Sequence, residues 1–230
     1  EEEESALKVL DSANAELESL NLSSITALNS PKAYENIRVL ILRSNRLFDM
    51  SELGLSGLLR LTDLDLGSNR LVGYVPKGCI PSSVERLDMS YNQITNISEI
   101  IHVSSLKVFN ARNNKIKEMG AMPPSITEFD VSFNQLTSLI GLRMLSLSPL
   151  LTVASVAGNP IVGMHPDIRS VVSSMIPSIL TLDGITQPGH KIRKSESRYV
   201  SRKNQGYIDK VSEFALNRSN SQAMDGRETI

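Results

Sequence analysis

The chain contains very little cysteine and few aromatic residues. Its 230 residues include one cysteine, no tryptophan and only 4% aromatic residues. One thiol cannot form a disulfide within the chain, which excludes the disulfide framework of small secreted domains. No apolar run approaches the roughly 18 residues that a membrane-spanning helix needs. The net charge of −1 gives no general attraction to nucleic acid or to anionic membranes, so neither partner is expected.

Common catalytic and metal-binding motifs are missing as well. The three histidines, His102, His165 and His190, lie far apart, and the H-E-x-x-H, C-x-x-C, G-x-x-x-x-G-K-S/T and G-x-S-x-G patterns are absent. Cys79 has no activating base near it in the sequence, so we expect it to be a packing residue. We therefore expect a protein that is not an enzyme and has no cofactor, metal site or small-molecule substrate.

The chain is rich in one repeated pattern, L-x-x-L-x-L-x-x-N-x-L. Its asparagines are 24, 23, 22, 20 and 25 residues apart, at Asn45, Asn69, Asn92, Asn114, Asn134 and Asn159. This period and template are typical of leucine-rich repeats. They predict an α/β solenoid, a horseshoe in which each repeat adds a short strand to a parallel, concave sheet.

The two ends of the chain differ from the repeats. Residues 1–16 are expected to form an N-terminal capping helix, because Ala6, Leu7 and Leu10 give an apolar stripe and the leading glutamates suit a helix N-terminus. A C-terminal cap is predicted over 163–189, and a basic, polar tail that is largely disordered alone over 190–230.

About seven repeats are predicted over 17–162. The first is degenerate, with Leu17, Leu20 and Leu22 at the leucine positions and Ile25 in place of the asparagine. Prolines predict extended return segments in repeats three and five, whereas Ser51 and Ser98 predict single helical turns in repeats two and four. These prolines are Pro76, Pro81, Pro123 and Pro124.

The repeats and the C-terminal cap resemble a known group of short intracellular leucine-rich-repeat proteins, the phosphatase-1-regulator type. Axonemal dynein-associated light chains, tubulin-folding cofactors and a spliceosomal leucine-rich protein share this type. The cap residues that carry the resemblance run Asn159-Pro160, His165-Pro166-Asp167-Ile168-Arg169, Ile176-Pro177 and Leu180-x-Leu182-Asp183-Gly184. The resemblance covers about 17–185 and implies the fold more specifically than the partner.

This sequence departs from that group in three ways. Its repeat spacing varies, the stretch 71–76 looks like the extended returns of plant-type repeats, and the phosphatase-binding residues of the group have no counterpart. Secreted leucine-rich-repeat proteins usually close their ends with disulfides, so one cysteine favours a cytoplasmic location. The chain begins with glutamate and not methionine, so we expect it to be part of a longer sequence. Whether a targeting segment precedes it is not decided by these residues.

The expected function is that of a scaffold or adaptor that binds a protein partner on the concave sheet. The resemblance favours a cytoskeletal or flagellar and ciliary assembly, with tubulin, dynein or another cytoskeletal protein as the partner. The alternatives are a regulatory subunit of a protein phosphatase, a nuclear ribonucleoprotein component and an extracellular receptor.

Side chains at template positions 3, 5 and 7 should point out of the concave face, because strand residues alternate sides. The predicted partner-binding residues are Arg43, Asp63, Asp65, Arg86, Asp88, Tyr91, Arg112, Glu128, Asp130 and Phe133. Aromatic and arginine residues often carry interface energy. The alternative is that these are solvated side chains that pair across strands.

Two basic segments lie outside this face. The tail has six basic residues, Lys191, Arg193, Lys194, Arg198, Arg202 and Lys203. They predict a second contact with an acidic surface, such as tubulin tails or nucleic-acid phosphates, or else a soluble linker. Arg46, Arg70 and Lys115, which directly follow asparagines, are expected to be solvated.

Overall fold

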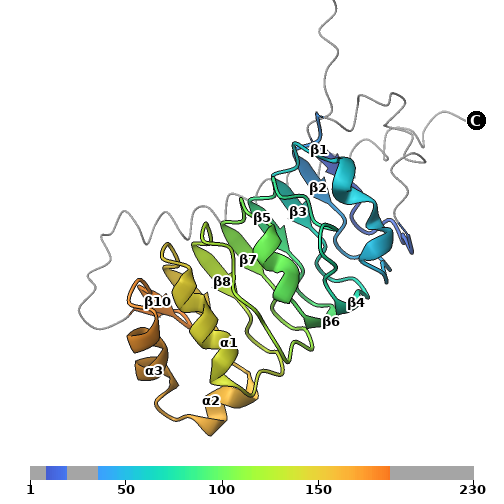
Figure 1. Ribbon diagram of the computed structural model, residues 1–230. Coiled ribbons are helices and arrows are strands. Elements are labelled where there is room, and N and C mark those ends of the chain that lie inside the picture. Colours follow the sequence, from blue (N-terminus) through green and yellow to red (C-terminus); the bar gives the residue numbers. More distant parts are fainter. Residues whose placement is uncertain (1–8, 20–35, 187–230) are drawn as a thin grey trace, which may run out of the picture. The chain divides into compact units, whose positions relative to one another are not determined.

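The protein is described by a computed structural model over residues 9–19 and 36–186, and the rest of the chain lies outside the described residues. A nine-stranded sheet runs through this part (Figure 1). In spatial order its strands are β1 (Val9–Asp11), β2 (Val39–Ile41), β3 (Asp63–Asp65), β5 (Arg86–Asp88), β7 (Val108–Asn110), β8 (Glu128–Asp130), β9 (Val153–Ser155), β10 (Thr181–Leu182) and β11 (Ile185–Thr186). All neighbours pair in parallel except β10 and β11.

The strands pair in the register that the repeat template predicts. Leu40 pairs with Leu64, Leu64 with Leu87, and the same inward position continues through Phe109, Phe129 and Ala154. This constant register means that every repeat contributes the same position to the same level of the core. The predicted leucine-rich-repeat solenoid with its parallel sheet is therefore confirmed.

The predicted N-terminal capping helix is wrong for its described part. Val9–Asp11 form strand β1, which extends the sheet by pairing with β2. Leu10 is buried in the core, and the N–H of Leu17 donates to Asn45 Oδ1, as the residue two after an asparagine does in later repeats. The first repeat therefore begins before the degenerate copy predicted from Leu17 onward.

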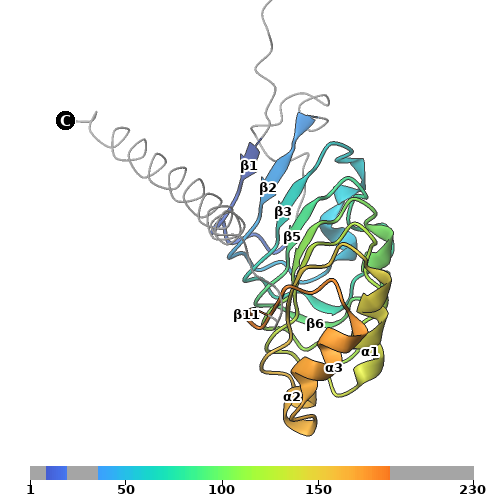
Figure 2. The same cartoon turned by 90° about the vertical axis from the view of Figure 1, so that its left-hand side faces the viewer.

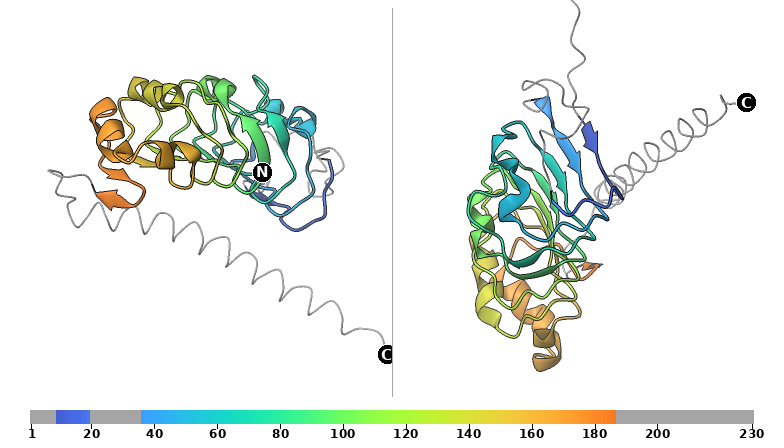
Figure 3. Two further views of the ribbon diagram at one scale, coloured as in Figure 1. Left: turned by 90° about the horizontal axis from the view of Figure 1, so that it is seen from below. Right: turned by 90° about the vertical axis from the view of Figure 1, so that its right-hand side faces the viewer.

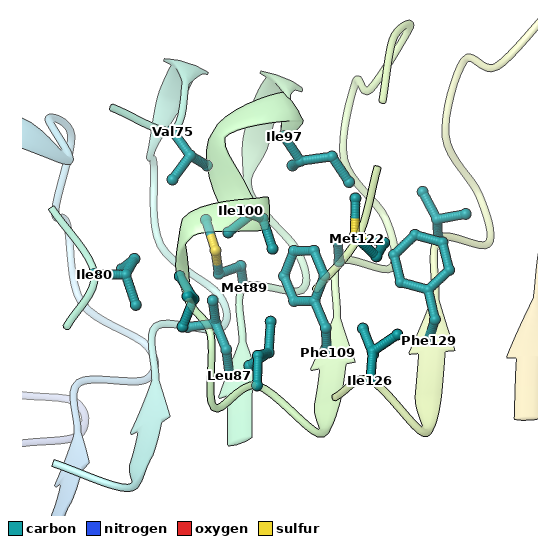
Figure 4. Packing of buried hydrophobic residues seen from close by; sticks show 14 of the residues in the cluster. Val75, Ile80, Leu87, Met89, Ile97, Ile100, Phe109, Met122, Ile126 and Phe129 are labelled. Carbon is teal, nitrogen blue, oxygen red and sulfur yellow. The ribbon is translucent and has the colours of Figure 1, made fainter. Parts of the chain in front are cut away.

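The core is a continuous stack of apolar side chains inside the coil. Figure 4 shows Leu87, Phe109 and Phe129 projecting from successive strands toward the return segments. The rings of Phe109 and Phe129 are 5.9 Å apart between centroids and are tilted by 39°. Burying one such side chain stabilises the fold by about 1.5–3 kcal/mol.

The repeated asparagines form a buried ladder that links adjacent repeats. Asn114 Oδ1 accepts a hydrogen bond from the N–H of Ile94, and its Nδ2 donates to the carbonyl oxygens of Met89 and Ala111. Asn69, Asn92, Asn134 and Asn159 repeat this arrangement. Each amide thus satisfies buried backbone groups of two repeats, which explains why the sequence repeats this residue type.

The return segments lie on the side opposite to the main sheet (Figures 2 and 3). Single 3₁₀ turns at Ser51–Leu53 and Ser98–His102 confirm the helical returns predicted for repeats two and four, and another turn spans Leu55–Gly57. Repeats three and five have no helix in their described returns, as their prolines predicted. A second, parallel sheet joins β4 (Val72–Tyr74) to β6 (Gln93–Asn96).

The α-helices all lie toward the C-terminal end of the described chain. They are α1 (Leu139–Met144), which a 3₁₀ turn at Leu145–Leu147 follows, α2 (Pro160–Met164) and α3 (Ile168–Met175). Strands β10 and β11 then form a hairpin whose turn residues, Asp183 and Gly184, both have positive φ. Asp183 Oδ1 also accepts the N–H groups of Val156 and Ala157, which are the backbone donors at the end of β9.

Candidate partner-binding site on the concave sheet

The outward side chains of the main sheet form three rows across the strands. In register, position 3 includes Asp63, Arg86 and Glu128, and position 5 includes Asp65, Asp88 and Asp130. Position 7 follows two residues later and includes Arg43 and Arg112. The fold therefore brings the predicted residues of separate repeats onto one face, which we call the concave face.

Arg43 binds carboxylates from two later repeats. Its Nε is 2.9 Å from Asp65 Oδ2, and its Nη2 is 2.9 Å from Asp88 Oδ2. The guanidinium lies directly against Gly67, where an added Cβ would be 2.5 Å from Nη2 and 2.6 Å from Cζ. Glycine at position 67 thus leaves the space that Arg43 needs to span three repeats.

Asp65 is buried beneath this arginine. Only 2% of Asp65 is exposed, and its Oδ1 accepts the N–H of Gly67. Burial and then the nearby charge of Asp88 raise the pKa of Asp65, against the opposing effect of Arg43. The expectation that Asp65 meets a partner needs correction, because its carboxylate is enclosed and already paired.

Two further carboxylates of the N-terminal strands also have partners within the sheet. Asp63 Oδ1 is 3.4 Å from Arg86 Nη1, and its Oδ2 accepts the hydroxyl of Thr62. Asp88 Oδ2 additionally accepts the side-chain amide of Asn110. The charges on β3 and β5 are therefore largely compensated by each other, in the manner of cross-strand pairs.

The carboxylates of β8 are less compensated. Asp130 Oδ1 accepts both the N–H and the hydroxyl of Ser132, which fixes its orientation. Glu128 lies between Val108 and Val153 in the paired strands. Among the residues that the structure describes, neither Glu128 nor Asp130 has a cation within ion-pair distance.

Tyr91 and Phe133 stand at the edge of the concave face in an uncommon backbone conformation. Both occupy template position 8 and have φ near +55°, a region that bulky residues rarely adopt. Tyr91 is 54% exposed and Phe133 is 47% exposed. The Arg112 guanidinium stacks 4.3 Å from the centre of the Phe133 ring, and its Nη1 donates to Ser132 Oγ.

Some residues of the concave face were not predicted from the sequence. Asp11 of β1 extends position 5, but it was assigned to a helix. Ser90 and Ser132, which orient aspartates, could have been recognised from the repeated Asp-x-Ser spacing. The six basic tail residues and their second contact lie outside the described residues, so that expectation stays a prediction.

The described ranges contain no group of three or more His, Cys, Asp and Glu side chains that could hold a metal ion, and no helix long and apolar enough to cross a membrane. A hollow of about 270 Å³ lies away from the concave face, among return-segment residues that include Val75, Ile80 and His102. Cys79 packs against the core, as predicted, and burial raises the pKa of its thiol to about 11.

Comparisons with known proteins point to the same class of fold. The family model described as "Leucine Rich repeat" matches residues 81–97, which contain β5 and the following asparagine turn. Together with the in-register parallel sheet, this match supports a leucine-rich-repeat solenoid, a scaffold class that typically serves protein interaction. The search of curated proteins found no match.

Several solved structures are similar over part of the chain. One is the Drosophila melanogaster SNF/U2A′ complex, with 21% identity over 53% of this chain and 68% of that chain, and a TM-score of 0.42. Another is YopM from Yersinia enterocolitica WA-314, with 27% identity over 54% of this chain, 25% of that chain and a TM-score of 0.45. A third is the LRIM1/APL1C complex, with 18% identity, coverage of 65% and 26%, and a TM-score of 0.48.

Proposed function

We propose that this protein is a non-enzymatic interaction module whose concave face binds a basic segment of a protein partner. The observation that carries the proposal is the pair of uncompensated carboxylates on β8, Glu128 and Asp130. Asp130 is held in place by Ser132 before a partner arrives, which lowers the entropic cost of binding. Val108 and Val153 flank Glu128 and offer apolar contact to the partner's side-chain stems.

The overall charge of the face supports the same kind of partner. The outward positions of β1–β9 carry three arginines, namely Arg43, Arg86 and Arg112. They carry six carboxylates, namely Asp11, Asp63, Asp65, Asp88, Glu128 and Asp130. Carboxylates thus exceed cations on this face, and a surplus of one sign favours encounter with a segment of the opposite sign.

Substitutions that remove the two negative charges of β8 test the proposal. Three baits would each capture partners from the native cell: the wild-type chain, the variant Glu128→Gln/Asp130→Asn and the control Glu52→Gln/Asp167→Asn. Glu52 and Asp167 are exposed residues away from the sheet, so the control removes the same two charges elsewhere. The captured proteins would be purified and their affinity for each variant measured by calorimetry.

The expected result is one partner whose affinity falls about tenfold or more with the β8 variant and stays constant with the control. A partner that binds all three chains equally would show that the concave face is not its site. In the full chain, replacing the six tail lysines and arginines by glutamine tests the second contact separately. That variant should weaken binding further and reduce its dependence on salt.

The partner's identity would decide between the proposed cellular roles. The resemblance to axonemal dynein light chains favours a cytoplasmic role in cytoskeletal or flagellar assembly, which capture of tubulin or dynein subunits would support. Capture of a phosphatase catalytic subunit would instead identify a phosphatase regulator. An association that RNase disrupts would identify a ribonucleoprotein component.

A further inference from the structure

A strip of basic and aromatic side chains lies beside the acidic concave face. It follows the line where the strands end at the asparagine turns, in repeats three to six. We define the edge strip as Arg70, Tyr91, Arg112, Lys115 and Phe133. All five side chains lie at template positions 7, 8 or 10 of four consecutive repeats, whose strands are about 4.8 Å apart.

The three cations of this strip lack carboxylate partners within the described chain. The Arg112 guanidinium donates to the Ser132 hydroxyl and stacks on the Phe133 ring, and Lys115 Nζ donates to the neutral Gln93 Oε1 at 2.8 Å. No acidic group among the described residues lies within ion-pair distance of Arg70, Arg112 or Lys115. Three other arginines of the solenoid, Arg43, Arg46 and Arg86, do have such partners, whereas no ion pair is formed by Arg38, Arg60, Arg143 or Arg169 among the described residues.

The two aromatic residues occupy backbone positions that do not favour them, although the Phe133 ring stacks with the Arg112 guanidinium and lies against Gly158, where an added Cβ would be 2.7 Å from the ring. Position 8 is left-handed in repeat after repeat, and the other residues there are Asn14, Ser44, Ser68, Asn113 and Gly158. Asparagine and glycine tolerate this conformation, whereas an aromatic residue is strained in it. A strained and half-exposed ring at a regular position is typical of a functional surface rather than of a core.

The spacing of the two aromatic rings suits an extended ligand. Tyr91 and Phe133 are two repeats apart, which places them about 10 Å from each other along the sheet. Arg112 comes from the repeat between them and stacks on one of the rings. A carboxylate could bind the guanidinium fork while neighbouring apolar side chains cover the rings.

We propose that the edge strip binds an extended acidic segment of a protein partner, with apolar side chains between its carboxylates. Nucleic acid fits less well, because each of its regularly spaced phosphates adds a charge that a cation of the protein must offset. The strip also has only three unpaired cations, fewer than a typical phosphate-binding groove uses. This site is separate from the β8 carboxylates and requires a ligand of opposite charge.

Fluorescence anisotropy on the full chain provides the test. The probe is a labelled synthetic peptide of alternating glutamate and leucine, and the counter-probes are an alternating lysine and leucine peptide and a single-stranded thymidine oligonucleotide. The strip variants are Arg70→Gln/Lys115→Gln and Tyr91→Asn. The matched control is Lys77→Gln/Arg143→Gln, which removes one exposed lysine and one exposed arginine elsewhere.

We expect the acidic peptide to bind the wild-type chain and to bind each strip variant about tenfold more weakly. The control should bind like the wild type, and added salt should weaken binding. Tyr91→Asn should keep or raise the melting temperature, because asparagine suits the left-handed position, so weaker binding cannot be attributed to unfolding.

Three results would overturn the proposal. They are the absence of peptide binding, equal weakening by the control pair, and tighter binding of the oligonucleotide through the same residues. Glu128→Gln/Asp130→Asn should leave the affinity for the acidic peptide unchanged or higher. Failure of the edge strip is therefore distinguishable from failure of the basic-partner site on β8.

Discussion

Replacing Gly67 by alanine should destabilise the protein only while Arg43 is present. An added Cβ would be 2.5–2.9 Å from three guanidinium atoms of Arg43. Position 67 does not have a positive φ, so alanine adds no backbone strain. The substitution thus acts by displacing the guanidinium from Asp65 and Asp88.

The magnitude follows from the two contacts that would be lost. Each is a charge-assisted hydrogen bond of 2.9 Å, and such a bond contributes about 1.5–3 kcal/mol when it is shielded from water. The Arg43 side chain is 32% exposed and Asp88 is 22% exposed, so solvent screening reduces these values. We expect Gly67→Ala to lower the free energy of unfolding by about 1–3 kcal/mol.

The sign of the effect should reverse when the guanidinium is removed. In an Arg43→Met background, alanine at position 67 has no guanidinium to displace. It should then stabilise the protein by about 0.4–1 kcal/mol, because it restricts the unfolded chain. The coupling energy between the two positions should therefore be about 1.5–4 kcal/mol.

Urea denaturation of the wild type, the two single variants and the double variant measures this coupling. Gly163→Ala is the matched control, because a Cβ at that helical position meets no atom within 4 Å. It should stabilise both backgrounds by a similar amount. If Gly67→Ala changed stability equally with and without Arg43, the guanidinium would not depend on the space at Gly67.

Two further predictions concern titratable groups. Burial, and then the charge of Asp88, raise the pKa of Asp65 in the folded state. The contribution of Asp65 to stability is therefore fully present below its unfolded pKa of about 4, and it is lost as the pH rises through the folded pKa. Denaturation should therefore show a larger cost of Asp65→Asn near pH 4 than at pH 7, and the opposite trend would mean that Arg43 outweighs burial. Burial raises the pKa of the Cys79 thiol to about 11. Iodoacetamide at pH 8 should therefore label this thiol rapidly in urea but only slowly in the folded chain, and mass spectrometry would measure both rates.

The regular repeats could be predicted from sequence because each template position has its own physical requirement. The asparagine must satisfy backbone groups in two repeats, and the leucines must reach one continuous core. The prolines of repeats three and five likewise prevented helical returns, as expected. Each requirement concerns one template position, so the residue type at that position is enough to indicate it.

The first repeat was missed because it lacks the asparagine of the template. Ala15 stands where an asparagine would be expected, and it lies 30 positions before Asn45. Asn45 accepts the N–H of Leu17 and donates to the carbonyl oxygen of Ser12, as later asparagines do for the repeat before them, and it also accepts the N–H of Ala15. An unusually long repeat without its own asparagine therefore resembled a helical cap in the sequence.

The sequence identified the outward rows of the site but not the pairing within them. Arg43 reaches Asp88 two repeats away because glycine occupies the intervening position, which the composition of the rows does not reveal. The sequence also placed Tyr91 and Phe133 near the edge without indicating their left-handed backbone. The pairing and the left-handed backbone each depend on several residues at once, so neither could be predicted from the sequence pattern alone.

The pairing pattern divides the concave face into two parts with different roles. On β3 and β5, aspartates bind Arg43 and Arg86, so a partner would have to break existing ion pairs before binding there. On β8, Glu128 and Asp130 have no such cation among the described residues, and Ser132 already orients Asp130. Binding on β8 therefore requires less reorganisation, while the paired strands keep adjacent repeats in register. Under the proposed function, the first contact with a basic partner is therefore expected on β8 rather than on the more numerous aspartates of β3 and β5.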